Sequence, residues 1–139
     1  MKKQKKIRAA VIGLGVGAHQ ARTLSLNPSV ELAWLCDIDE TRLAELGSQL
    51  SEAKLTKNPN DVLQDPDINL VCIASYDQFH FEQAIKALDN GKHVYLEKPI
   101  CLSKDEIKDI HKKLTEHPDL RLSSNMVLRT CPLFNKVKK

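Results

Sequence analysis

Aromatic residues are scarce in this sequence, and long apolar segments are missing. Only 4% of its 139 residues are Phe, Trp or Tyr. No apolar run approaches the roughly 18 residues that a membrane-spanning helix needs. The basic start, "MKKQKKIR", leads into a short apolar stretch interrupted by glycines, which does not fit a secretory leader. We therefore expect a globular protein without a membrane partner.

A basic surface for nucleic acid is also missing. The net charge of +3 comes from residues 1–8 and 136–139, and the part of the chain between them is net acidic. Proteins that bind nucleic acid gather Lys and Arg on structured elements. We expect solvated basic ends, with residues 1–6 as an N-terminal tail, and no nucleic-acid partner.

The cysteines lack the spacing of metal ligands. Cys36, Cys72, Cys101 and Cys131 form no C-x-x-C pair. Cys36 and Cys72 fall inside apolar runs typical of strands, where a thiol behaves as a small hydrophobe. The pattern indicates a reduced, cytoplasmic setting and no metal site.

Short apolar runs alternate with helical patterns along the chain. Strands are predicted at 7–13, 30–37, 54–57, 68–75, 93–97 and 121–126. Helices are predicted at 18–26, 39–50, 61–64, 78–89 and 103–114. This alternation predicts an α/β fold: a doubly wound parallel sheet of about six strands with helices on both faces. Residues 127–139 show no periodicity and are typical of a frayed end or of the start of a further segment.

A glycine-rich turn follows the first strand. Gly13, Gly15, Val16, Gly17 and Ala18 fit the pattern G-x-G-x-x-A. The first glycine allows a tight turn, the second lets a pyrophosphate approach the backbone, and the small Ala18 lets the helix pack closely. The helix N-terminus adds partial positive charge. The pattern predicts a dinucleotide site at these residues.

An acid ends the second strand. Asp37 lies 24 residues after Gly13, where a carboxylate accepts hydrogen bonds from ribose hydroxyls. Its charge would repel a 2′-phosphate and so favours NAD, but the nearby Arg42 can accommodate that phosphate and leaves NADP open. Ile38 is placed in the same predicted site. Two alternatives remain at this point: Asp37 as a helix cap, and a site for S-adenosylmethionine, which uses a similar glycine turn and acid.

Two later strand ends carry further polar segments. "Ser-Tyr-Asp-Gln-Phe-His" (75–80) follows the fourth strand, and "Glu-Lys-Pro" (97–99) follows the fifth. Together with the glycine turn they resemble the Gfo/Idh/MocA (glucose–fructose oxidoreductase / inositol dehydrogenase) family, whose members carry a (T/S)-P-N-x-x-H segment and an E-K-P segment. The resemblance covers residues 8–134, although Tyr76 and Asp77 stand where the family usually has Pro and Asn.

This resemblance implies a Rossmann-type NAD(P)-binding domain over residues 7–126, followed by an exit segment at 127–139 toward a substrate domain that this sequence does not contain. It also implies an oxidoreductase that transfers a hydride from a sugar, cyclitol or related polyol hydroxyl to NAD. By itself the chain is expected to bind the cofactor and to catalyse little or nothing. A homo-oligomer is left open, because the family commonly assembles through its second domain.

The resemblance assigns roles to individual residues. Lys98 would lie beside the nicotinamide and the substrate hydroxyl, where an ammonium stabilises alkoxide charge or relays a proton. A cis bond before Pro99 would aim Lys98 into the cleft. The cofactor-binding residues implied at these strand ends are Ser75, Tyr76, His80, Glu97, Lys98 and Asn125.

Less specific interpretations stand beside these roles. Lys98 could be a solvated strand end, and His80 could simply pack in the first turn of a helix. The whole chain could be a non-catalytic nucleotide-binding or regulatory module, or a binder of S-adenosylmethionine. E-K-P argues against the last, because methyl transfer has no use for it. An exposed apolar face is expected where a second domain would pack.

Overall fold

Six parallel strands form one sheet at the centre of the molecule. A computed structural model describes residues 6–137 of the chain. Its strands are β1 (Ile7–Ile12), β2 (Val30–Cys36), β3 (Lys54–Thr56), β4 (Leu70–Ile73), β5 (His93–Leu96) and β6 (Leu122–Ser124). Every neighbouring pair is parallel, in the order β3-β2-β1-β4-β5-β6. The chain therefore changes direction across the sheet between β1 and β4, which is a topological switch point.

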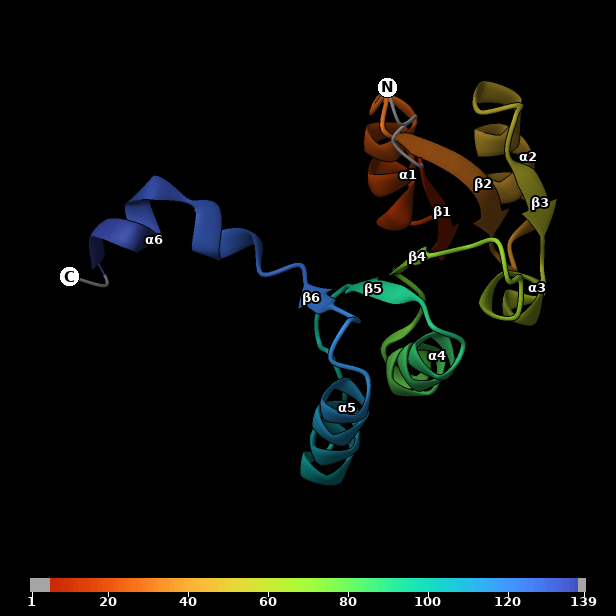
Figure 1. Cartoon of the computed structure of the whole chain (residues 1–139). Coiled ribbons are helices and arrows are strands. Elements are labelled where there is room, and N and C mark those ends of the chain that lie inside the picture. Colours follow the sequence, from red (N-terminus) through yellow and green to blue (C-terminus); the bar gives the residue numbers. More distant parts are fainter. Residues whose placement is uncertain (1–5, 138–139) are drawn as a thin grey trace, which may run out of the picture.

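Helices cover both faces of this sheet. They are α1 (Gly17–Ser25), α2 (Glu40–Gln49), α3 (Pro59–Leu63), α4 (Asp77–Asp89) and α5 (Lys104–Glu116). Figure 1 shows α1 and α2 above the sheet and α3, α4 and α5 below it. Because parallel crossovers are right-handed, reversing the strand order moves the helices to the opposite face. The predicted doubly wound, Rossmann-type α/β fold is confirmed.

The central strand β1 contributes to a separate hydrophobic core on each face. Ala10 and Ile12 pack with residues of α3 and α4, and Val11 packs with residues of α1 and α2. Successive side chains of a strand point to opposite faces, so a strand covered on both sides must be apolar throughout. This is why β1 reads as a continuous apolar run.

Helix starts follow local capping chemistry. The Asp39 side chain accepts from two backbone N–H groups of α2, and Ser103 and Glu106 form a capping box at α5. The helix expected at 61–64 begins earlier, at Pro59, because Asn58 caps it and proline is tolerated in a first helical turn.

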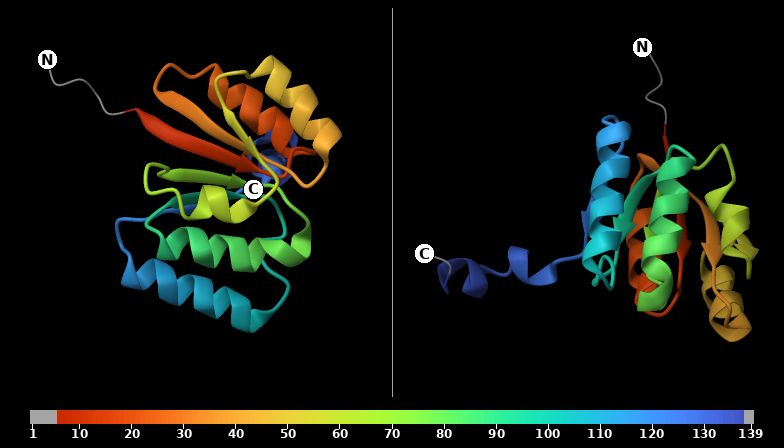
Figure 2. Two further views of the ribbon diagram at one scale, coloured as in Figure 1. Left: turned by 90° about the vertical axis from the view of Figure 1, so that its right-hand side faces the viewer. Right: turned by 90° about the horizontal axis from the view of Figure 1, so that it is seen from below.

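The C-terminal residues leave the body of the molecule. They form the 3₁₀ helix η1 (Val127–Thr130) and the short helix α6 (Pro132–Val137), which project away from the sheet in Figures 1 and 2. The sequence pattern did not predict these helices, because segments this short show no periodicity. Of the predicted basic tail at 1–6, residues 1–5 lie outside the described part of the chain.

A buried lysine joins the segments that precede β4 and β5. Lys92, just before β5, is 0% exposed, and its Nζ donates to the carbonyl oxygens of Asp65 at 2.5 Å and Ile68 at 3.0 Å. Burial lowers the pKa of Lys92, and the Asp65 carboxylate partly opposes this. Within residues 6–137, no helix is long and apolar enough to cross a membrane.

Candidate functional site

A cavity of ≈ 690 Å³ opens at the carboxyl ends of β1, β2 and β4. Cofactor sites commonly measure about 300–1,000 Å³, and the switch point of a doubly wound sheet is where ligands bind. The predicted site residues that line the cavity are Gly13, Gly15, Val16, Asp37, Ile38, Arg42, Ser75 and Tyr76. The fold therefore gathers three separate segments of the predicted site around one space.

The three glycines of the turn after β1 have different steric surroundings. Gly13 has a φ of +89°, and a Cβ added there would lie 2.3 Å from the carbonyl oxygen of Ala74. A Cβ at Gly17 would lie 2.9 Å from Val11 Cγ1, so Gly17 lets α1 approach the sheet. At Gly15 a Cβ would meet only Arg42 Nη1, at an ordinary 3.4 Å. Packing explains Gly13 and Gly17, whereas Gly15 leaves space on the cavity side that the fold itself does not need.

The start of α1 is open to an anion. Val16, at its N-cap, makes no side-chain cap, and no acid lies in the first turn. By contrast, side chains cap α2, α3 and α5. The first N–H groups of a helix lack partners within it and carry partial positive charge. A phosphate group at the glycine turn would satisfy them.

Asp37 fastens the glycine turn to α2. The residue is 7% exposed; its Oδ2 accepts from the Leu14 N–H at 2.5 Å and its Oδ1 from the Asp39 N–H at 2.8 Å. An ionised carboxylate has about four acceptor positions, so both oxygens can still accept from a ligand hydroxyl. The loop-capping role and a ribose-binding role are therefore compatible in one residue.

A second polar cluster lies at the ends of β5 and β6. Glu97 is 7% exposed, and its Oε1 accepts from Gln20 Nε2 of α1 and from Asn125 Nδ2, both at 2.6 Å. Lys98 is exposed, and its bond to Pro99 is cis. Glu97, Lys98 and Asn125 stand outside the cavity lining, at the neighbouring strand ends. The cluster connects three elements, and sequence reasoning missed Gln20, whose partner is distant in the chain.

His80 also lies outside the cavity lining. It is 1% exposed, and its ring nitrogens contact two carbonyl oxygens, Nδ1 that of Pro99 at 2.6 Å and Nε2 that of Ser75 at 3.0 Å. The imidazole thus links the loop after β4 to the turn after β5. These two contacts agree with the interpretation that His80 packs in the first turn of its helix. His80 does not line the cavity in which a cofactor would bind.

Several lining residues were not singled out from the sequence: Asp39, Lys57, Pro59, Phe79 and Gln83. Lys57 directly follows β3, so attention to the carboxyl end of the weak 54–57 strand would have found it. Gln83 accepts from the Ser75 hydroxyl at 2.7 Å. No sequence signal indicated that contact, because it depends on the rotation of α4.

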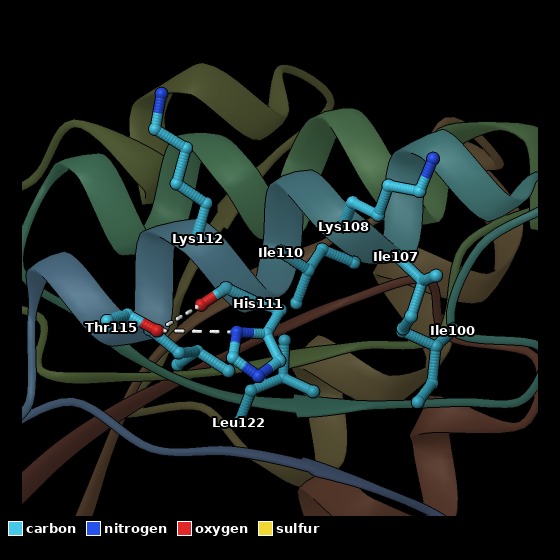
Figure 3. Close-up of a pocket in the computed structure, with 9 residues that line it drawn as sticks. Ile100, Ile107, Lys108, Ile110, His111, Lys112, Thr115 and Leu122 are labelled. Carbon is cyan, nitrogen blue, oxygen red and sulfur yellow. Dashed lines mark hydrogen bonds between the residues drawn. The ribbon is translucent and has the colours of Figure 1, made fainter.

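A separate hollow of ≈ 660 Å³ runs along α5 and β6. Figure 3 shows apolar side chains, among them Ile107, Ile110 and Leu122, with Lys108 and Lys112 extending away from them. The other lining residues include Lys108, His111, Lys112 and Thr115, and the Thr115 hydroxyl lies 3.3 Å from His111 Nδ1. The exposed apolar face expected where a second domain would pack stays a prediction.

Comparison with known proteins identifies close relatives. The chain is 34% identical over 113 residues to scyllo-inositol 2-dehydrogenase (NAD(+)) of Bacillus subtilis, covering 80% of this chain and 33% of that protein. It is 30% identical over 134 residues to myo-inositol 2-dehydrogenase of Thermotoga maritima, covering 96% of this chain and 40% of that protein. The chain thus spans between a third and two fifths of the length of these relatives.

Solved structures agree. The scyllo-inositol dehydrogenase of Lactobacillus casei with bound NAD(H) and scyllo-inositol superposes with a TM-score of 0.86 at 26% identity, over 96% of this chain and 40% of that one. A family model described as "Oxidoreductase family, NAD-binding Rossmann fold" matches residues 7–125. These matches set aside the S-adenosylmethionine alternative. The chain therefore belongs to the Gfo/Idh/MocA oxidoreductase family, of which it is the NAD-binding Rossmann-fold domain.

Proposed function

We propose that this chain is the cofactor domain of an enzyme that oxidises a hydroxyl of a cyclitol, sugar or related polyol, and that NAD binds in the cavity at the switch point. The observation that carries the proposal is Gly15, which faces the cavity and which the fold does not require. Relatives whose names specify inositol dehydrogenases support the substrate class.

The cavity residues divide into two groups with different tasks. The turn from Gly13 to Ala18, with the uncapped start of α1, binds the pyrophosphate through main-chain N–H groups. Asp37 accepts hydrogen bonds from the adenosine ribose, and Ile38 and Tyr76 provide apolar walls. These contacts hold the cofactor along the strand ends.

Lys98 carries the chemistry of the proposed reaction. When bound, the nicotinamide supplies the hydride acceptor. The Lys98 ammonium stabilises the negative charge that develops on the substrate oxygen, and it relays the proton of the substrate hydroxyl to solvent. Glu97, braced by Gln20 and Asn125, fixes the end of β5 from which Lys98 extends.

The chain alone is proposed to bind cofactor with little or no turnover, because it spans only 33% to 40% of the catalytic relatives it matches. The buried, unpaired thiols of Cys36 and Cys72 are consistent with a reducing, cytoplasmic location. Assembly of the longer protein into a homo-oligomer is also part of this proposal.

Gly15→Ala separates cofactor binding from folding. Calorimetric titration of the wild-type chain should show NAD⁺ binding, and Gly15→Ala should weaken it by about tenfold or more, a change of roughly 1.4 kcal/mol. Its urea-denaturation midpoint should stay near that of wild type, since the added Cβ meets only Arg42 at 3.4 Å. Unchanged NAD⁺ affinity in Gly15→Ala would contradict the proposal, as would binding of S-adenosylmethionine in place of NAD⁺.

A further inference from the structure

Two cationic side chains flank Asp37 in the cavity wall, Arg42 from α2 and Lys57 from the loop after β3. The sheet register pairs Cys36 with Thr56, and the Asp37 N–H donates to the Thr56 carbonyl oxygen at 3.3 Å. Lys57 therefore follows β3 directly beside the end of β2. On the other side, Arg42 Nη1 lies against the open position at Gly15.

Each of these cations has a carboxylate of its own. Arg42 Nε lies 3.5 Å from Asp39 Oδ2, and Lys57 Nζ donates to Glu40 Oε1. The Lys57 and Glu40 side chains are 58% and 75% exposed, so water and ligands compete with this pair. The hydrogen bond and positive charge of Lys57 lower the pKa of Glu40.

The charges around Asp37 bear on one group of the cofactor. Asp37 repels a 2′-phosphate on the adenosine ribose and favours the free hydroxyls of NAD. Two cations in the same wall offset that repulsion, since a phosphate binds strongly to Lys and Arg donors. The net preference then depends on how far the neighbouring carboxylates engage these cations.

We propose that Lys57 is a specificity-determining residue of this cofactor site: with Arg42 it receives the 2′-phosphate of NADP, and Glu40 competes with that phosphate for the Lys57 ammonium. The inference rests on the proposed cofactor function and adds a residue and a competition to it. It follows that the domain binds NADP⁺ measurably, in second place to NAD⁺. Glu40, which does not touch the cavity, shifts the ratio of the two affinities.

The test compares dissociation constants for NAD⁺ and NADP⁺, measured calorimetrically at one low salt concentration. In Lys57→Gln, the affinity for NADP⁺ should fall by about 3- to 10-fold relative to the affinity for NAD⁺, as expected for the loss of a charge-assisted contact at a partly exposed site. In Glu40→Gln, the affinity for NADP⁺ should rise by about 2- to 5-fold relative to the affinity for NAD⁺, because Glu40 no longer competes with the phosphate for Lys57. Added salt should reduce both shifts, since the contacts are exposed.

A matched control removes one negative charge elsewhere. Asp105 pairs with Lys108 on α5, also at exposed positions, and neither residue lines the cofactor cavity. Asp105→Asn should leave the ratio of affinities at its wild-type value. If the ratio in Asp105→Asn shifted as much as in Glu40→Gln, the net charge of the protein would explain the effect, and the inference would be overturned.

The remaining outcomes are distinguishable. A ratio that stays at its wild-type value in Lys57→Gln or in Glu40→Gln overturns the inference and leaves NAD binding intact. An equal loss of affinity for NAD⁺ and NADP⁺ in Lys57→Gln would mean that Lys57 contacts a group present in both cofactors, which also overturns the inference. If the wild-type chain binds neither cofactor, the proposed function itself fails.

Discussion

Replacing Gly13 with alanine should destabilise the fold far more than replacing Gly91 with alanine. Both glycines have positive φ, +89° and +69°, a region that costs other residues roughly 1–2 kcal/mol. Their surroundings differ. At Gly13 the new Cβ would lie 2.3 Å from the Ala74 carbonyl oxygen and 2.6 Å from the Ser75 nitrogen, whereas nothing lies within 4 Å of it at Gly91.

The two variants therefore separate backbone strain from steric overlap. The overlap at Gly13 involves backbone atoms that cannot rotate away, so the strands β1 and β4 must shift; such overpacking costs about 1–3 kcal/mol. We expect Gly13→Ala to lose about 2–5 kcal/mol of unfolding free energy, the sum of both effects. Gly91→Ala should lose about 1–2 kcal/mol, from strain alone.

Urea denaturation followed by far-UV circular dichroism measures both losses. A domain of this kind has about 5–15 kcal/mol of stability, so Gly13→Ala should remain folded in water but with a much lower midpoint. Equal losses in the two variants would refute the reasoning, because the contact with the Ala74 carbonyl would then contribute nothing.

Two further predictions concern buried polar groups. Lys92→Met leaves two carbonyl oxygens without their donor and should cost about 1–3 kcal/mol in urea denaturation. Burial lowers the pKa of Lys92 in the folded chain, so as pH rises toward 10.5 this lysine loses its proton in the folded chain before it does in the unfolded chain. The unfolded chain then binds more protons than the folded chain, and the unfolding free energy of the wild type should rise with pH relative to that of Lys92→Met. Parallel pH profiles of the two proteins would contradict this. Burial raises the thiol pKa of Cys36 and Cys72 to about 12, so at pH 8 a thiol reagent should modify only Cys101 and Cys131 until denaturant is added, and early reaction of either buried thiol would disprove it.

Features formed within a few residues could be predicted from the sequence. The Asp39 cap and the capping box of Ser103 and Glu106 close over three residues or fewer, so the spacing of residue types is enough to indicate them. The doubly wound parallel sheet could be predicted as well, because alternating strands and helices with right-handed crossovers allow few topologies. The positions of the glycine turn and of Asp37 at strand ends could also be predicted, because each directly follows an apolar run in the sequence.

Contacts between distant segments were decided only by the tertiary structure. Gln20 and Glu97 are 77 residues apart, and their hydrogen bond depends on the packing of α1 beside the end of β5. Likewise, Lys57 stands beside Asp37 only because β3 pairs with β2 in one register. His80 contacts the carbonyl oxygens of Pro99 and Ser75, which follow two different strands. Sequence by itself determined which residues end the strands, but register, helix rotation and rotamer determined which of those residues meet, because these depend on packing across the whole sheet.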